Sequence, residues 1–316
     1  MPANACMPRL WSRRGLLIAL AAGSVTMLSA CRVQLDENAP HIPLVPTRAP
    51  MEDEKPLLEV LGRTRSLESL ARALGEAPTS IVARLGTVHA TQVAVITRLL
   101  RDGGVPQSLI GGSPATGPTG SLTHPVLSAA TLSAAESESV SYVALADISS
   151  AHVALIGSML AQRIASVTLL GGAATPAPPP GFSSPEAVQL LEATRAAVYG
   201  FEVVAAQIDS TGRALAMSTL LSLRTRTSEL QALVGSSGPP PPLGYELPFP
   251  VADPDSARRL AQHLLEALLT RQAAALVPAA GEAAALTTLV HWLGATESTA
   301  SQWGASLAAF PGLTNG

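Results

Sequence analysis

The sequence predicts an all-α fold that is built from two four-helix bundle units. Hydrophobic residues make up 47% of the 316-residue chain, but they are mostly Ala, Leu and Val, and only 3% of the chain is aromatic. This composition favours closely packed helices with Ala/Leu-rich cores, and it disfavours an all-β sandwich, which needs aromatic and β-branched runs. Segments with helical periodicity also alternate with loops rich in Gly, Pro, Ser and Thr.

The first predicted bundle covers residues 52–170. Apolar residues recur there at spacings of three and four, as they do along one face of an amphipathic helix. A long loop follows the second helical segment and reaches Pro125. The predicted helices are Lys55–Leu74, Pro78–Arg101, Ser133–Ala146 and Ser149–Leu169.

The second predicted bundle covers residues 185–312 and repeats this plan after a Pro-rich linker at residues 171–184. Its longest loop, Gly235–Asp255, again separates the second helix from the third. A four-helix bundle with one long crossover has ferritin-like connectivity, so we expect two ferritin-like units. The predicted helices are Pro185–Ile208, Gly212–Leu233, Ser256–Val277 and Glu282–Ala309.

Three stretches of the second half resemble an uncharacterised ferritin-like domain family of actinobacterial lipoproteins. The most specific parts are an Ala-Val-Tyr-Gly sequence and a Leu-Pro-Phe-Pro-Val sequence, and the resemblance covers about Pro185–Leu307. It implies a fold similar to that of ferritins, with an unknown activity. The stretches are Glu192–Phe201, Arg224–Arg226 and Tyr245–Val251.

The chain departs from the pattern of this family at two places. A Glu-His pair commonly precedes Ala-Ala-Val-Tyr-Gly in the family, whereas Thr194 and Arg195 occupy these positions here. A His commonly precedes the Arg-x-Arg of the second helix, and here that position is Leu223. Neither replacement keeps a metal ligand, so the resemblance implies the scaffold without the family's metal-ligating residues.

The N-terminus has the form of an export signal. A basic segment without acidic residues precedes Leu16–Leu28, an apolar run that is shorter than the ~20 residues needed to span a bilayer. The sequence Leu-Ser-Ala-Cys that ends at Cys31 resembles the lipobox of bacterial lipoproteins. It implies a signal peptide at residues 1–30, a lipid on Cys31 and a Pro-rich tether over residues 31–51; the alternative is an ordinary signal peptide.

Export would change the net charge and the cysteine content of the mature chain, and it would determine where the protein is located. Ser12–Leu17 contains Arg13-Arg14 and resembles a twin-arginine signal, with general secretion as the alternative. Loss of residues 1–30 would leave a net charge of −6 and only Cys31 as cysteine, which disfavours nucleic-acid binding and excludes an internal disulfide. We expect the protein at the extracytoplasmic face of the cell membrane, with the membrane and an envelope protein as partners.

The stronger candidate for a metal site lies in the first half. His89 and His152 fall on the apolar stripes of their predicted helices, and Glu136 lies on the third helix. Imidazoles that face one another inside a bundle can bind a transition metal. The alternative is structural, because a buried His is commonly hydrogen-bonded to neighbouring groups and Glu136 fits a capping box that begins at Ser133.

The C-terminal half offers weaker metal candidates. A di-iron bundle needs a Glu from each of two helices and Glu-x-x-His from each of the other two. The chain has no such motif, and the nearest is the reversed His263-Leu-Leu-Glu266. Charged residues on Ala-rich helices also serve as solvated faces or ion pairs. The candidate ligands are Glu192, Glu229, His263, Glu266 and His291, with Glu202 and Glu297 on the same predicted helices.

The sequence does not contain the common catalytic motifs. Gly-x-Ser-x-Gly, Ser-x-x-Lys, His-Glu-x-x-His and a Gly-rich phosphate loop followed by Lys are all missing. We therefore expect a membrane-tethered, non-catalytic structural or interaction module without a cofactor. The alternatives are a ferritin-like protein that binds a transition metal or acts as an oxidoreductase, and a carrier of an apolar ligand in a bundle cavity.

Overall fold

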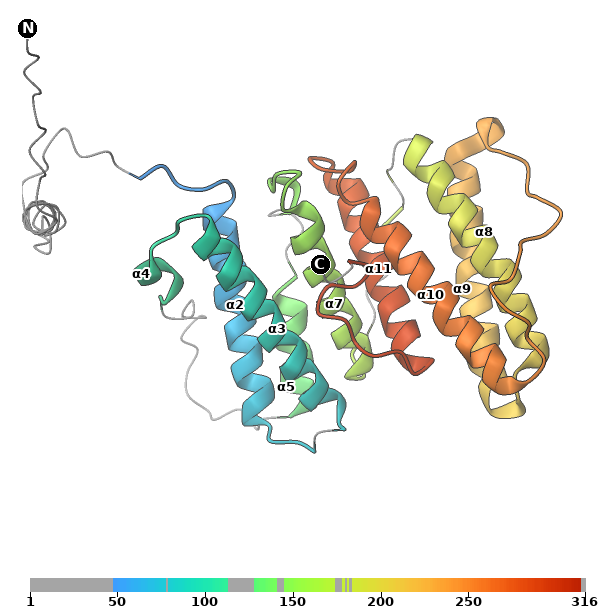
Figure 1. Cartoon of the computed structure of the whole chain (residues 1–316), viewed down its shortest axis with the longest axis horizontal. Coiled ribbons are helices and arrows are strands. Elements are labelled where there is room, and N and C mark those ends of the chain that lie inside the picture. The colour runs from blue at the N-terminus through green and yellow to red at the C-terminus, as the bar shows by residue number, and fades with distance from the viewer. Residues whose placement is uncertain are drawn as a thin grey trace, which may run out of the picture. The chain divides into compact units, whose positions relative to one another are not determined.

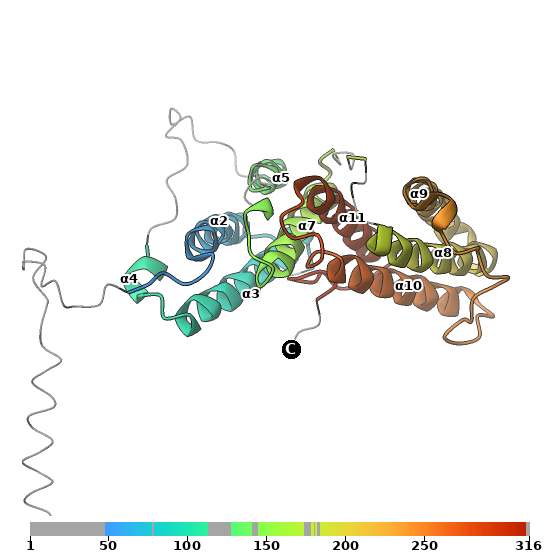
Figure 2. The ribbon, with the colours of Figure 1, turned by 90° about the horizontal axis from the view of Figure 1, so that it is seen from above.

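The structure is a computed structural model, and it describes residues 48–77, 79–112, 128–140, 145–173, 178–179, 181 and 184–313. The predicted signal peptide, Cys31, most of the tether and part of the linker lie outside these residues. Residues from Pro50 onward form one compact unit, which Figures 1 and 2 show from two directions.

The described residues form helices and contain no strand, which confirms the all-α prediction. None of these helices combines the length and the hydropathy that a membrane span requires. The helices of the first half are α2 (Glu54–Ala73), α3 (Ile81–Asp102), α4 (Gln107–Ile110), α5 (Ala129–Glu138) and α7 (Val153–Leu169). Those of the second half are α8 (Ser184–Gln207), α9 (Ser210–Val234), the short 3₁₀-helix η1 (Gly235–Ser237), α10 (Pro254–Ala274) and α11 (Ala283–Gln302).

The start of α5 corrects the predicted capping box at Ser133. The helix begins four residues earlier, because Ser128 is its N-cap and accepts a hydrogen bond from the backbone N–H of Thr131 at 3.3 Å. Ser133 and Glu136 therefore lie inside the helix, and both are buried. Glu136 is consequently not a capping residue.

Other helix boundaries also differ from the prediction. The short helix α4 lies in a stretch that was expected to be a loop. Helix α7 begins at Val153 rather than Ser149, so His152 is its N-cap residue and not part of an apolar stripe. Helix α11 ends at Gln302, and the segment Trp303–Leu313 leaves it as a non-helical C-terminal segment.

The C-terminal segment links the two halves of the fold. The carbonyl of Ala309 accepts a hydrogen bond from the side chain of Gln92 on α3 at 2.8 Å. The carbonyl of Pro311 accepts one from Ser158 Oγ on α7 at 2.7 Å. Periodicity could not predict these contacts, because they join residues far apart in the sequence and depend on the helix ending early.

The helices of each half pack against one another in a closed arrangement. In the first half, α2 contacts α3 and α5, and α7 contacts α3 and α5. In the second half, α8 lies between α9 and α10, and α10 packs on α11 (Figure 2). Side chains complete this second arrangement, since Arg226 of α9 donates to Thr296 Oγ1 of α11 at 3.1 Å.

The two halves also share an interface between α7 and α11, which lie side by side in both views. One hydrophobic cluster extends across it and includes Met159 of α7 and Val290 of α11. Gly294 permits this close approach, because a Cβ atom there would lie 2.6 Å from the carbonyl oxygen of Ala161. The division of the chain into two bundle domains stays a prediction.

Candidate functional site

A fully buried polar cluster joins α2, α3, α5 and α7. Burial of polar groups is unfavourable unless they are hydrogen-bonded to one another, and burial of a charge is more unfavourable still. The first half nevertheless contains a cluster of seven polar side chains at zero exposure. This buried polar cluster consists of Thr64, His89, Gln92, Glu136, Gln162, Arg163 and Ser166.

His89 of α3 and Glu136 of α5 form the centre of the cluster. The distance from His89 Nε2 to Glu136 Oε1 is 2.7 Å, and that from His89 Nδ1 to Gln92 Oε1 is 3.2 Å. Both ring nitrogens of His89 therefore have partners within the protein. The sequence predicted that His89 and Glu136 belong to one site, and the structure brings these two residues together.

The amide groups around His89 determine where its protons lie. Gln92 Nε2 donates to the Ala309 carbonyl at 2.8 Å and to Gln162 Oε1 at 3.2 Å. Gln162 Nε2 in turn donates to Ser166 Oγ at 2.7 Å, whose own hydroxyl donates to the Gln162 carbonyl. Gln92 Oε1 thus faces His89 Nδ1 as an acceptor, and Nδ1 must carry a hydrogen.

A second proton lies between His89 Nε2 and Glu136 Oε1. Without it, two acceptors would stand 2.7 Å apart and repel each other. The proton can be bonded to the imidazole, which gives an ion pair, or to the carboxyl group, which gives a neutral pair. In both forms the His89–Glu136 pair has no net charge.

Arg163 of α7 brings a positive charge into the same region. Its Nη1 donates to the Ser139 carbonyl at 2.8 Å and its Nη2 to Thr64 Oγ1 at 2.8 Å, while its Nε has no hydrogen-bond partner among the described residues. Burial lowers the pKa of Arg163 to about 10, although the Glu136 carboxylate opposes this effect. The guanidinium is therefore still charged at neutral pH.

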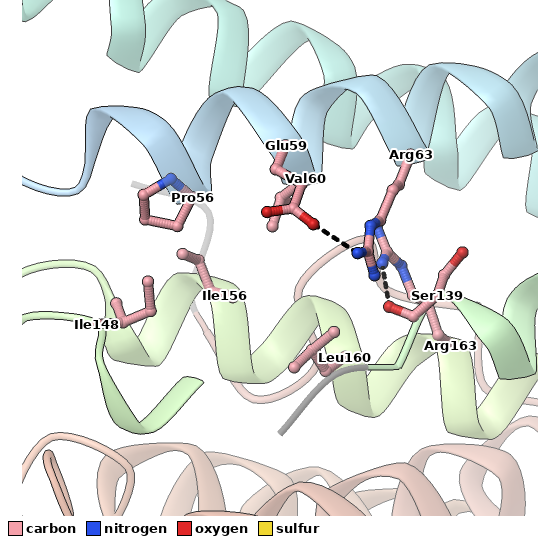
Figure 3. Close-up of a pocket in the computed structure, with 9 residues that line it drawn as sticks. All are labelled: Pro56, Glu59, Val60, Arg63, Ser139, Ile148, Ile156, Leu160 and Arg163. Carbon is pink, nitrogen blue, oxygen red and sulfur yellow. Dashed lines mark hydrogen bonds and ion pairs between the residues drawn. The ribbon is translucent and has the colours of Figure 1, made fainter. Parts of the chain in front are cut away.

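Arg163 also lines a small pocket between α2 and α7 (Figure 3). The pocket has a volume of about 30 Å³, and one water needs roughly 10–15 Å³ measured in this way. Arg63 of α2 lies at the same end of the pocket as Arg163, and it forms an ion pair with Glu59. Apolar side chains, including Val60, Ile156 and Leu160, form the rest of the lining.

His152 does not join His89 and Glu136 but has a partner of its own. Its Nδ1 donates to Asp53 Oδ2 at 2.8 Å, and the backbone N–H of Ser149 donates to the same carboxylate oxygen at 3.1 Å. The N-terminal ends of α2 and α7 are thereby fastened together. The predicted trio is thus divided into a buried pair and a separate contact at the helix ends.

The weaker C-terminal candidates are spread over the structure. Glu192 pairs with Arg195 at 2.8 Å, whereas Glu229, His263 and Glu266 are exposed and His291 is buried. In the parts of the chain that the structure describes, no three His, Cys, Asp or Glu side chains are grouped so that they could hold a metal ion.

Glu297 is the most perturbed acid of the second half. It lies on α11, is 2% exposed and lines a groove of about 640 Å³ that Glu266 and Gln262 also line. Burial raises its pKa to about 7, and a hydrogen bond from the Ala308 N–H to Oε1 at 2.8 Å opposes the increase. The carboxyl group thereby fastens the C-terminal segment to α11.

The motifs that carried the sequence resemblance pack around α10. Gly200 lies directly against the Leu264 side chain, so the Tyr-Gly sequence provides a close contact between α8 and α10. The rings of Tyr199 and Tyr245 lie 5.8 Å apart. Phe249 packs on His263 of α10, with 6.3 Å between ring centroids. These motifs therefore hold the long connection between α9 and α10 against the helices.

Sequence reasoning missed Arg163, Asp53 and Gln92. Arg163 is the only charged residue in the sequence of α7, and this was an available signal for a buried charge. Asp53 gave no comparable signal, because its partners lie 96 and 99 residues away in the chain. Gln92 lies one turn from His89, a spacing that places both on one helix face.

Comparisons with known proteins bear on the C-terminal half. Neither the curated proteins nor the solved structures gave a match. A protein-family model, described as a domain of unknown function (DUF4439), matches residues 187–315, which include most of α8 and all of α9, α10 and α11. The C-terminal part of this chain is thus similar to the DUF4439 family.

Proposed function

We propose that this protein is an exported lipoprotein whose helical unit is a non-catalytic structural or interaction module, held at the extracytoplasmic face of the cell membrane by a lipid on Cys31. The observation that carries the non-catalytic part is the engagement of both ring nitrogens of His89 by Gln92 and Glu136. His89, the side chain best suited to bind a metal, thus already has hydrogen-bond partners that hold helices together.

The outer face of α9 supports a role in interaction. Met217 is 52% exposed and Leu221 is 68% exposed, and the two lie one helical turn apart. Helix α9 packs mainly on α8, which leaves this face to solvent. An envelope protein is the partner that the proposal implies, and no role in nucleic-acid binding is included.

We also propose ferritin-like connectivity for the DUF4439 domain. The connection from α9 to α10 is the longest between helices of this half, and it separates the second helix from the third. One long crossover at this position is typical of ferritin-like bundles. The support is therefore the order and spacing of helices.

The anchoring part is tested by fractionation of cells that express the full chain. Cys31→Ala should move the protein from the membrane fraction to the soluble fraction, because two acyl chains supply stable attachment. Cys6→Ala is the matched control, since Cys6 lies in the segment that export would remove, and it should leave the protein in the membrane fraction. Membrane retention of Cys31→Ala would refute the anchor.

Metal binding is the second candidate function, and one observation favours it. Glu136 Oε2 is buried and has no hydrogen-bond partner among the described residues, next to an imidazole at the other oxygen. Elemental analysis of the full chain, purified after growth with iron, manganese or zinc, separates the two functions. Stoichiometric metal that is lost in both His89→Ala and Glu136→Gln would replace the first proposal by the second.

A further inference from the structure

A groove beside the C-terminal end of α11 has a lining of one sign of charge. It has a volume of about 640 Å³, and α10, α11 and the non-helical C-terminal segment all contribute to its lining. Glu266 of α10 and Glu297 of α11 line it, whereas none of the described Lys, Arg or His side chains does so. Such a lining attracts cations and repels anions.

Glu297 presents an unpartnered carboxylate oxygen to this groove. The residue is only 2% exposed, and its Oε1 accepts the hydrogen bond from the Ala308 N–H. Its Oε2 has no hydrogen-bond donor or ion-pair partner among the described residues, yet the protein does not enclose this atom. Because Glu297 lines the groove, the accessible Oε2 faces it. A carboxylate in such a place lacks a counter-charge, and a bound cation would supply one.

The other polar groups of the groove also suit a cation. Gln262 Nε2 donates to the Trp303 carbonyl at 2.8 Å, so its Oε1 is available as an acceptor. The Thr270 hydroxyl donates to the Glu266 carbonyl at 3.0 Å and keeps its lone pairs. The last turn of α11, which lines the groove at Ala300, carries the partial negative charge of a helix C-terminus.

The lining favours an organic cation over a metal ion. No third His, Cys, Asp or Glu of the described residues joins Glu266 and Glu297 as a possible metal ligand. A volume of several hundred Å³ is typical of small-molecule sites, and apolar side chains form a wall that suits methylene groups. The two carboxylates lie on different helices and suit two separate ammonium groups. The apolar wall consists of Leu269, Ala300, Ala305, Ala308 and Leu313.

We propose that this groove binds a small aliphatic diamine, with one ammonium group on Glu297 Oε2, the alkyl chain along the apolar wall and the second ammonium group toward Glu266. The site is separate from the lipid anchor and from the proposed interaction face on α9, so its failure would leave the fractionation test of the anchor unaffected. The DUF4439 match includes these residues but assigns no ligand to them.

Titration of the purified full chain with putrescine tests the site. We expect saturable heat in calorimetry and a matching rise of the thermal unfolding midpoint, because a ligand that binds only the native state stabilises it. Butylamine has the same alkyl chain but one ammonium group, and it should bind at least ~10-fold more weakly, since it lacks one charge-assisted hydrogen bond. Sodium chloride and magnesium chloride at the same ionic strength should give no saturable signal.

Three Glu→Gln variants assign the binding to the groove. Glu297→Gln keeps an acceptor for the Ala308 N–H but removes the charge, so it should weaken putrescine binding at least ~10-fold. Glu266→Gln should lower the affinity for putrescine toward that for butylamine. Glu282→Gln is the matched control, because Glu282 is an exposed acid at the other end of α11 that does not line the groove. It should bind like the wild type.

The pH dependence of binding separates a contact with Glu297 from a merely structural role of this residue. Burial raises the pKa of Glu297 to about 7 against the opposing Ala308 N–H, and Glu266 is the other charged group that lines the groove. Alkylammonium groups resemble Lys, whose ordinary pKa is about 10.4, so they stay charged from pH 6 to pH 8. Wild-type affinity for putrescine should therefore rise over this range, and that of Glu297→Gln should stay constant.

A further variant blocks the groove and leaves Glu297 intact. Ser306 is exposed and lines the groove, so Ser306→Lys places a competing ammonium group there and should weaken putrescine binding while the protein stays folded. The proposal is overturned if putrescine does not saturate, if Glu297→Gln and Glu282→Gln bind it equally, or if butylamine, sodium or magnesium binds as tightly as putrescine.

Discussion

His89 and Glu136 are 47 residues apart in the chain, yet the imidazole Nε2 and the carboxylate Oε1 lie 2.7 Å apart at zero exposure. The contact joins α3 to α5, two helices that have no extensive backbone approach. It therefore links α5 to α3 by hydrogen bonding, while the close helix packing of α5 is on α2 and α7.

Removal of one partner from this pair should be strongly destabilising. Glu136→Ala leaves His89 buried with a ring nitrogen that has lost its partner, and we expect a loss of ~3–5 kcal/mol in the free energy of unfolding from urea denaturation. A residue that only caps a helix would give a loss of ~1 kcal/mol. Glu138→Ala, on the exposed side of α5, is the control and should change stability by no more than ~0.5 kcal/mol. A loss near 1 kcal/mol for Glu136→Ala would contradict the assigned role.

The helices could be predicted from the sequence because each one carries its own periodic signal. The segment Lys55–Leu74 differs from α2 by one residue at each end, since Leu57, Leu61 and Leu67 mark the buried face. The predicted start of a helix was wrong where a different polar residue was the N-cap. Ser133 matched a capping box, but Ser128 is the N-cap of α5.

The candidate site was predicted only in part for a related reason. Periodicity indicates which face of a helix is buried, and it correctly predicted that His89 is buried. It does not indicate which helices meet, so the pairing of His152 with Asp53 and the entry of Arg163 into the buried polar cluster were not predicted. Such contacts depend on tertiary packing across many residues of sequence separation.

Glu297 should make stability depend on pH between the acidic and neutral ranges. Burial raises its pKa from 4.5 to about 7, so the folded state holds a proton there that the unfolded state has released. The stabilisation of the folded state that results from this raised pKa is fully present below pH 4.5 and is lost as the pH rises to about 7. At 1.36 kcal/mol per pKa unit, the loss is about 3 kcal/mol.

Urea denaturation between pH 4 and pH 8 measures this contribution. Glu297→Gln keeps an acceptor oxygen for the Ala308 N–H but cannot ionise, so its stability should fall less steeply with pH than that of the wild type. Glu266→Gln removes an exposed carboxylate that lines the same groove and should keep the wild-type slope. Parallel profiles for Glu297→Gln and the wild type would show that Glu297 is not the titrating group.

Asp53 should stabilise the helix ends at neutral pH and lose this effect in acid. Burial alone would raise its pKa, but hydrogen bonds from Ser149 and His152 outweigh burial and lower the pKa below 3.8. For a lowered carboxyl pKa, the stabilisation is present above pH 3.8 and disappears as the pH falls through the folded-state value. Asp53→Asn should therefore be less stable than the wild type at pH 7, and the difference should shrink below pH 3.8 in urea denaturation. An unchanged difference in acid would contradict this linkage.

The backbone at Asp53 allows a separate test. Asp53 has φ of 58°, in the left-handed region that favours glycine. Asp53→Ala and Asp53→Gly both remove the contacts with Ser149 and His152, but only alanine keeps a Cβ in this conformation. We expect Asp53→Gly to be more stable than Asp53→Ala by ~1–2 kcal/mol. Equal stabilities in urea denaturation would show that the left-handed conformation is not retained.

Gly294 should be essential for the close packing of α7 and α11. A Cβ atom at this position would lie 2.6 Å from the Ala161 carbonyl oxygen and 2.8 Å from Ile164 Cβ, so Gly294→Ala must separate the two helices. We expect a loss of ~1–3 kcal/mol in urea denaturation. Gly86→Ala on α3 is the matched control, because its nearest neighbour would be Ala71 Cβ at 3.6 Å, and the better helix propensity of Ala should raise stability by ~0.5–1 kcal/mol. If both variants gained stability, the close approach of α7 and α11 at Gly294 would be wrong, and with it the shared core of the two halves.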